Sequence, residues 1–326
     1  MFLSFLVFDN MVINILVLLV GMFFLIKGAD WFVDGASNIA KKMKIPSIII
    51  GLTLVSMGTS APEAAVSISA ALKGLDASSV GNIIGSNIFN TLFILGSSAI
   101  FTPLIVSKEM KKYDIPIMIG IYGVLILCGF VITPLKLDLI ESIIFILLFI
   151  GYIVFLILRA KKSNTEVVNE EVKEKKKISV VKCIIFTIVG LAGIVGGGTI
   201  VVNSAEAIAK AAGMSDLLVG LTILAVGTSL PELVTSIVAS IKKESDIAVG
   251  NVVGSNIFNV IFILGTSSTI SSLSITNTQM FDMLVMLGSG VLLFIITLIS
   301  KKINRVSGII LFLLYIAYLT FIIIRN

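Results

Sequence analysis

Glu63 is a carboxylate inside a long apolar stretch, with small polar residues just before it. Thr59 and Ser60 lie four and three residues earlier, so on a helix these side chains share one face. Pro62 cannot donate a backbone hydrogen bond, which predicts a kink or a local unwinding with released carbonyl oxygens. Hydroxyl, carbonyl and carboxylate oxygens together are the hard ligands that Ca²⁺ takes.

A second polar block, GNIIGSNIFN, spans residues 81–90. Ser86 and Asn90 are four residues apart in it and share a helix face, which adds neutral oxygens, and its glycines allow another helix to approach closely. The chain has no histidine, and its two cysteines, Cys128 and Cys183, are isolated and expected to be reduced packing thiols. The ligand set therefore fits Ca²⁺ and Na⁺ better than zinc or copper.

The chain contains both blocks twice. Residues 51–96 align without a gap on residues 220–265 at an offset of 169, and 25 of the 46 paired positions are identical. In a membrane protein, polar and helix-breaking residues at matching positions of two halves indicate a transporter with its site between the halves. Pseudo-twofold symmetry would bring both copies to one midplane location. The second copy supplies Thr228, Ser229, Glu232, Ser255 and Asn259.

Each block also has a purely structural interpretation. A small-residue pattern in a membrane helix can be a packing seam, and a single intramembrane glutamate can be a protonated structural group. The doubled constellation favours an ion site. Asp30 and Asp34, near the end of the first apolar run, have Thr199 and Asn203 as counterparts. For these two aspartates we favour local pairing or an ion-access vestibule.

Composition excludes a soluble globular domain: 57% of the residues are hydrophobic, 13% are charged and the mean hydropathy is +1.12. The apolar runs are long enough to cross about 30 Å of hydrocarbon as helices, and no short alternating segments suggest a β-barrel. We therefore predict an all-α integral membrane protein with ten transmembrane helices and no cleaved signal peptide. The predicted spans are 11–40, 46–72, 80–102, 114–134, 139–158, 180–210, 217–241, 247–270, 280–299 and 306–324.

Loop charge predicts the orientation. Loops after odd-numbered spans hold most of the lysines and arginines, which places them in the cytoplasm and both termini outside. Because each half has five spans, the second repeat must be inverted. The predicted division is a first repeat at 11–158, a cytoplasmic linker at 159–179 and a second repeat at 180–325. The linker is interpreted as a solvated segment; a lipid-touching role for its basic cluster is the alternative.

The two blocks resemble the alpha repeats of the sodium/calcium exchanger family, of the prokaryotic ten-helix type within the calcium/cation antiporter superfamily. The resemblance covers essentially the whole chain, including GADWFVDGA at 28–36. It implies that spans 1 and 6 are long tilted helices that slide over the bundle to alternate access. It also implies ligands at Thr59, Ser60, Glu63, Ser86, Asn90, Thr228, Ser229, Glu232, Ser255 and Asn259, with backbone carbonyls contributed by Ser56, Thr59, Ala225 and Thr228.

The resemblance also bears on the ions. Potassium-dependent exchangers, and some potassium-independent ones, carry aspartate where this chain has Asn259, which disfavours potassium co-transport. The proton/calcium branch typically has an acidic residue and a histidine in its GNxxE-type segments. This chain has Gly85-Ser86 and Gly254-Ser255 there and no histidine, which disfavours proton coupling. The expected function is a Na⁺/Ca²⁺ antiporter of the cell membrane, with Ca²⁺ export driven by Na⁺. An antiporter driven by H⁺, or one that moves Mn²⁺ or Mg²⁺, remains the alternative.

The sequence disfavours two other classes of membrane protein. A cation channel needs an open pore and no counter-ion, whereas paired inverted repeats suit alternating access. An intramembrane hydrolase would need a base beside Ser60 or Ser229, and the sequence places no histidine or lysine there. The chain is therefore expected to have no enzymatic activity. We also expect no cofactor and no nucleic-acid partner. The protein is expected to function as a monomer in the lipid bilayer, with Ca²⁺ and Na⁺ as substrates.

Overall fold

The computed structural model describes residues 10–166, 179–213, 225–300 and 302–325. Within these ranges, eight helical segments are long and apolar enough to cross a membrane. A ninth span is a bent pair, Ser47–Thr59 followed by Ala61–Leu72. The eight segments are Met11–Met43, Asp76–Phe101, Met110–Ile132, Leu139–Lys162, Val180–Ala211, Ser245–Ile270, Asn277–Ile299 and Arg305–Arg325.

These segments confirm an all-helical membrane-type fold and nine of the predicted spans to within a few residues. The remaining predicted span, 217–241, lies partly outside the described residues, and only its later part is seen, as α11 (Ala225–Gly227) and α12 (Leu230–Ile241). The count of ten helices and the inverted orientation of the second half therefore stay predictions.

The span that carries the first glutamate is broken, as predicted. It contains α2 (Ser47–Ile50), η2 (Gly51–Val55) and α3 (Ser56–Thr59), and it bends by 49° before α4 (Ala61–Leu72). Ser60 at the bend has φ −79° and ψ 6°, outside the helical region. Ser229, before α12, has nearly the same angles, φ −90° and ψ 7°. In both copies a proline follows in the first turn of the new helix, where its missing N–H is not needed.

The polar blocks lie on the two most enclosed helical segments of the bundle, α5 (Asp76–Ile88) and α13 (Ser245–Phe258). Each continues through a π-helical turn, η3 (Phe89–Ile94) or η8 (Asn259–Leu264), into α6 (Leu95–Phe101) or α14 (Gly265–Ile270). π-turns inside helices are frequent at functional sites because they redirect side chains. Here they contain Asn90 and Asn259.

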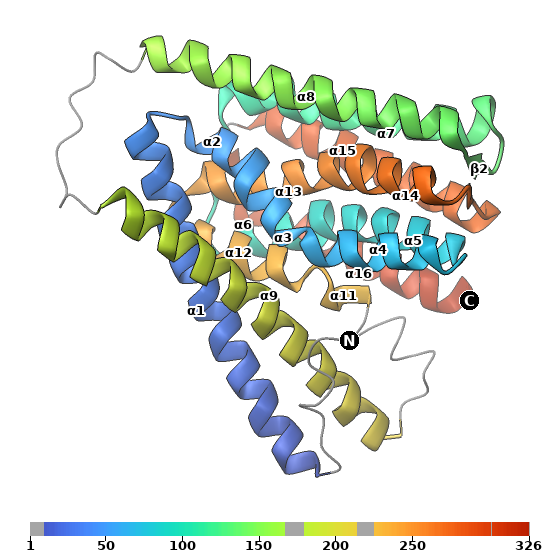
Figure 1. The fold of residues 1–326 in the computed structure, drawn as a ribbon, viewed down its shortest axis with the longest axis horizontal. Helices are drawn as coiled ribbons and strands as arrows, with labels where there is room; N and C mark the ends of the chain where they lie inside the picture. The colour runs from blue at the N-terminus through green and yellow to red at the C-terminus, as the bar shows by residue number, and fades with distance from the viewer. Residues whose placement is uncertain (1–9, 167–178, 214–224, 301, 326) are drawn as a thin grey trace.

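The helices α1 (Met11–Met43) and α9 (Val180–Ala211) lie side by side and run obliquely across the other helices (Figure 1). Glycines allow this close approach. A Cβ on Gly28 would lie 2.7 Å from the backbone nitrogen of Ile194, and one on Gly190 would lie 2.5 Å from that of Phe32. The two backbones therefore touch without intervening side chains, and the pair forms one packed unit.

The rest of the bundle surrounds α5 and α13. Exposed apolar side chains cover helix α8 (Leu139–Glu166) and helix α16 (Arg305–Arg325), as at Leu147 and Leu313. Strand β1 (Leu104–Ile105) pairs antiparallel with β4 (Lys302–Ile303), and β2 (Lys136–Leu137) pairs with β3 (Leu273–Ser274), so both short ladders join the two halves. The remaining elements are η4 (Met110–Asp114), α7 (Ile115–Leu127), η5 (Cys128–Ile132) and α15 (Asn277–Ile299).

Candidate cation-binding site

The two glutamates occupy equivalent places at the breaks. Glu63 is the third residue of α4 and Glu232 is the third residue of α12, and both side chains are fully buried. A helix N-terminus favours a negative charge, because its first N–H groups have no partner within the helix. The breaks therefore place two carboxylates where the backbone partly compensates their charge.

Each carboxylate is held by a serine from the other copy. The Ser229 hydroxyl donates to Glu63 Oε1 over 2.8 Å, and the Ser60 hydroxyl donates to Glu232 Oε1 over the same distance. These crossed hydrogen bonds bring the two broken spans together. They also use only one oxygen of each carboxylate.

Five buried acceptor oxygens of the predicted ligands have no hydrogen-bond partner within the described part of the chain. An unpaired polar atom in an apolar interior is unfavourable by several kcal/mol, so several unpaired acceptors among one set of predicted ligands are suited to bind a cation. All five are oxygens, and a hard cation such as Ca²⁺, which prefers oxygen ligands, could bind to them. They are Glu63 Oε2, Glu232 Oε2, Asn90 Oδ1, Asn259 Oδ1 and Thr228 Oγ1.

The remaining predicted side chains lie around these oxygens. Ser229 Oγ is also 3.2 Å from Ser86 Oγ, and the Ser255 hydroxyl donates to the backbone carbonyl of Ser56 over 3.4 Å. The Thr59 hydroxyl donates to Asn251 Oδ1 over 2.9 Å, unlike that of its counterpart Thr228. The structure thus brings the side chains of both copies into one cluster.

The backbone carbonyls behave differently in the two copies. The Ser56 carbonyl accepts from the Ser60 N–H over 2.9 Å, in the α-helical manner, because Pro62 removes the donor to Gly58 and not the donor to Ser56. In the second copy the Ser229 N–H donates to Val226, one residue later than its α-helical partner Ala225. The first copy therefore keeps the α-helical bond to Ser56, whereas the second copy replaces the bond to Ala225 with one to Val226.

Sequence reasoning missed four asparagines. Asn82 donates to Ser67 Oγ over 2.9 Å and ties α5 to α4, and Asn251 makes the same bond to Ser236 Oγ and ties α13 to α12. The other two, Asn87 and Asn256, contact the predicted amide ligands. A signal was present, since all four are identical between the copies at the offset of 169.

Asp30 and Asp34 lie away from this cluster. Both pair with Lys242, at 2.6 and 2.7 Å from its Nζ. Lys41 of α1 pairs with Glu244 over 2.9 Å beside them. Both aspartates are therefore paired as expected, but their partner is not local: it lies far away in sequence, at the turn between α12 and α13.

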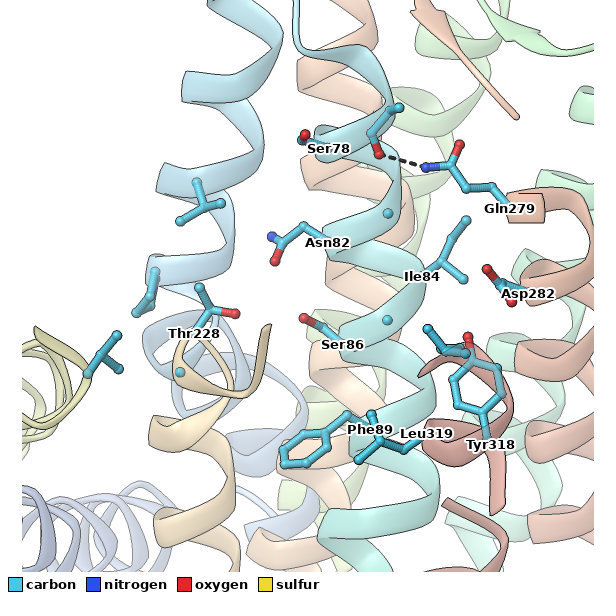
Figure 2. Close-up of a pocket in the computed structure, with 18 of the residues that line it drawn as sticks. Ser78, Asn82, Ile84, Ser86, Phe89, Thr228, Gln279, Asp282, Tyr318 and Leu319 are labelled. Atoms are coloured by element: carbon cyan, nitrogen blue, oxygen red, sulfur yellow. Dashed lines mark hydrogen bonds between the residues drawn. The ribbon is translucent and has the colours of Figure 1, made fainter. Parts of the chain in front are cut away.

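A cavity of about 920 Å³ reaches the cluster between α5, α9, α15 and α16. Ser86 and Thr228 both line it, and Figure 2 shows their hydroxyl groups pointing toward each other. Asn82 lies on the same side of α5 as Ser86. Gln279, which donates to the carbonyl of Ala77 over 2.6 Å, lines another part of the cavity. An ion could therefore reach Ser86 and Thr228 from this cavity, whereas the two glutamates lie behind them and are fully buried.

Comparisons with known proteins cover most of the chain. The family described as "Sodium/calcium exchanger protein" matches residues 13–158 and 182–324. The chain is 36% identical to the putative antiporter CaxA of Alkalimonas amylolytica over 317 residues, which cover 94% of this chain and 98% of that protein. It is 33% identical over 345 residues to the sodium/calcium exchanger MaX1 of Methanosarcina acetivorans, covering 94% and 97% of the two chains.

A solved structure shows the same fold. The sodium-calcium exchanger NCX_Mj, soaked with zero Na⁺ and Ca²⁺, superposes with a TM-score of 0.84 at 31% sequence identity. The match covers 96% of this chain and 100% of that one.

Proposed function

The chain belongs to the sodium/calcium exchanger family, and we propose that it exchanges Na⁺ for Ca²⁺ across the cell membrane by alternating access. The inward Na⁺ gradient would drive Ca²⁺ out of the cell. The observation that carries the proposal is the pair of fully buried glutamates, Glu63 and Glu232, each of which keeps one oxygen without a partner.

Charge balance explains why such a site exchanges ions. With both glutamates ionised, the empty site carries two negative charges, and charge at the bilayer midplane costs several kcal/mol. The empty carrier should therefore rarely change sides. One Ca²⁺ neutralises the site, and two or three Na⁺ ions can occupy overlapping oxygens instead. Occupancy by three Na⁺ leaves one positive charge and makes transport electrogenic.

The ligands that we propose come equally from both copies. Calcium takes six to eight oxygens, and the hydroxyl, amide, carbonyl and carboxylate groups of the cluster supply that number. The proposed set is Ser56, Thr59, Ser60, Glu63, Ser86, Asn90, Ala225, Thr228, Ser229, Glu232, Ser255 and Asn259, with Ser56 and Ala225 acting through their carbonyls.

We propose that the structure represents the outward-facing state. The cavity is lined by the start of α5 and α15 and by the end of α16, which lie on the side assigned to the outside by loop charge. On the other side, the ion pairs of Lys242 and Lys41 join α1 to the turn before α13. In this assignment both termini are outside and the linker at 159–179 is cytoplasmic. The two five-helix repeats, 11–158 and 180–325, are inverted, and α1 and α9 slide together during transport.

Transport into vesicles tests the function. The purified protein is reconstituted into Na⁺-loaded vesicles that are diluted into Na⁺-free buffer containing Ca²⁺. We expect Ca²⁺ uptake that requires internal Na⁺ and that K⁺-loaded vesicles do not support. Uptake that follows a pH jump would instead identify H⁺ as the coupling ion. Uptake of Mn²⁺ or Mg²⁺ but not Ca²⁺ would change the substrate.

A further inference from the structure

The proposed amide ligands, Asn90 and Asn259, are held by a series of buried hydrogen bonds from residues that are not themselves proposed ligands. We propose that Asn87, Asn256 and Thr91 are positioning residues that fix the amides of Asn90 and Asn259 with the oxygen toward the cation. This inference rests on the proposed function, because it assigns a purpose to groups that surround the ligands. All five side chains are buried, so water does not compete for these bonds.

The first arm of the chain ends at Asn259. Asn87 Nδ2 donates to the backbone carbonyl of Asn256 over 3.1 Å. Since a backbone carbonyl can only accept, this bond fixes which end of the Asn87 amide is the nitrogen. Asn87 Oδ1 then accepts from Asn259 Nδ2 over 2.9 Å. The oxygen of Asn259 is left pointing away from the chain, without a partner in the described residues.

The second arm ends at Asn90 and passes through a hydroxyl. The Thr91 hydroxyl donates to the carbonyl of Asn87 over 2.9 Å, so its oxygen can only accept from Asn256 Nδ2, at 2.8 Å. Asn256 Oδ1 in turn accepts from Asn90 Nδ2 over 3.1 Å. The oxygen of Asn90 is again the end without a partner among the described residues.

The two arms are related but not identical. The counterpart of Thr91 in the second copy is Val260, which has no hydroxyl. Only the arm that ends at Asn90 therefore uses a bridging hydroxyl, while Asn87 reaches the opposite backbone directly. The difference allows each arm to be tested by its own substitution.

Fixing the amide matters because its two ends have nearly the same shape and opposite chemistry. Rotation by half a turn replaces an acceptor oxygen with an NH₂ group, which has two donors and repels a cation. In a buried chain, reversing one amide would place donor against donor and acceptor against acceptor, and low polarity makes such mismatches costly. The hydrogen bonds therefore prevent the NH₂ groups of Asn90 and Asn259 from pointing toward the cation site, even before an ion binds.

A double-substitution experiment tests the first arm. We expect Asn87→Ala to raise the Ca²⁺ concentration for half-maximal Na⁺-dependent uptake by about tenfold, the loss expected for one fixed hydrogen bond to a ligand. In an Asn259→Asp background, the same Asn87→Ala change should have an effect of about threefold or less, because both oxygens of a carboxylate are acceptors in either orientation. Size-exclusion profiles and melting temperatures of all variants are compared alongside.

The second arm provides an independent test that does not depend on an active Asn259→Asp variant. Thr91→Val removes the hydroxyl and should raise the half-maximal Ca²⁺ concentration, whereas Thr91→Ser keeps the hydroxyl and should rescue it.

The outcomes separate the two proposals. If the wild-type protein shows no Na⁺-dependent Ca²⁺ uptake, the proposed function itself fails. If the wild type transports but Asn87→Ala has equal effects in both backgrounds, or Thr91→Val and Thr91→Ser behave alike, these residues only fill space and the positioning role is overturned.

Discussion

At the scale of single residues, the site depends on two carboxylates held in crossed contacts. Each serine hydroxyl donates to the glutamate of the other copy, so each half completes the other. A hydrogen bond to a charged group is stronger than a neutral one, at about 1.5–3 kcal/mol. The crossed serines therefore fix the geometry of the charges that a cation must bind.

Replacing either glutamate by glutamine tests the charge directly. We expect Glu63→Gln and Glu232→Gln each to abolish Ca²⁺ transport, since one negative charge cannot neutralise Ca²⁺. Folding should be retained because glutamine is nearly isosteric. Vesicle uptake and the elution profile in detergent measure the two properties. Wild-type transport rates in either variant would contradict the role of these carboxylates.

Removing a crossed serine tests the contact. Ser60→Ala or Ser229→Ala should raise the half-maximal Ca²⁺ concentration by about tenfold or more, because a charge-assisted hydrogen bond and an oxygen ligand are lost together. Ser267→Ala is the matched control: its buried hydroxyl has no hydrogen-bond partner in the described residues, so its loss should be nearly neutral. An equal effect of all three substitutions would show a general packing defect instead.

Much of the residue-scale picture could be predicted from the sequence. The repeat pointed to Glu63 and Glu232, because a carboxylate at the same place in two apolar segments is costly without a function. The role of Asn87 and Asn256 could not be predicted. Their bonds join α5 to the region of α13, and no local pattern reveals which helices touch.

At the scale of elements, glycine decides how closely helices approach. The α1–α9 pair is packed backbone to backbone, so even a methyl group cannot be added at the contact without displacement. One other glycine of α9, Gly196, has nothing within 4 Å of the position that a Cβ would take. The difference gives a controlled test of whether the pair must stay closely packed.

Gly190→Ala should destabilise the protein, because its Cβ would lie 2.5 Å from the backbone nitrogen of Phe32. Overpacking costs about 1–3 kcal/mol, so we expect a lower melting temperature and slower transport. Gly196→Ala, on the same helix with nothing within 4 Å of the added Cβ, should behave like the wild type. Similar melting temperatures for the two variants would argue against close α1–α9 packing.

Element boundaries followed from apolar length, and the bend at Ser60 followed from Pro62. The π-turns η3 and η8 were not predicted. A π-turn inserts one residue into a helix without any change in hydrophobicity, so composition and periodicity do not show it. They matter because they include Asn90 and Asn259.

At the scale of the whole molecule, equivalent positions of the two copies have different surroundings. A Cβ on Gly254 would lie 2.8 Å from Leu52 Cα, while its counterpart Gly85 has open space around it. Thr59 is fully buried and bonded to Asn251, while Thr228 lines the cavity. A molecule built from two similar halves is thus asymmetric in this structure, as the proposed alternating access requires.

Accessibility of introduced cysteines tests this asymmetry. The native cysteines are both buried, so they contribute little background. We expect Thr228→Cys to react with a membrane-impermeant thiol reagent added from outside, and Thr59→Cys to stay protected. Bound Ca²⁺ should slow the reaction at residue 228. Labelling at residue 59 but not at 228 would reverse the proposed orientation or state.

The conformational state could not be predicted from the sequence. Both copies carry the same blocks, so the sequence pattern does not indicate which side of the membrane the site faces. In the proposed outward-facing state, the ion pairs of Lys242 with Asp30 and Asp34 lie at the closed end, and they join residues about two hundred positions apart. Contacts between residues so far apart in the sequence can be identified only from the folded structure.

The proposed exchange requires that Na⁺ and Ca²⁺ occupy one shared site between the two glutamates. The most direct measurement is equilibrium Ca²⁺ binding to the purified protein at increasing Na⁺ concentration. We predict an apparent Kd for Ca²⁺ that rises more steeply than in proportion to Na⁺, at constant binding capacity, because more than one Na⁺ replaces each Ca²⁺. A Kd that is independent of Na⁺ would contradict a shared site and, with it, the proposed exchange.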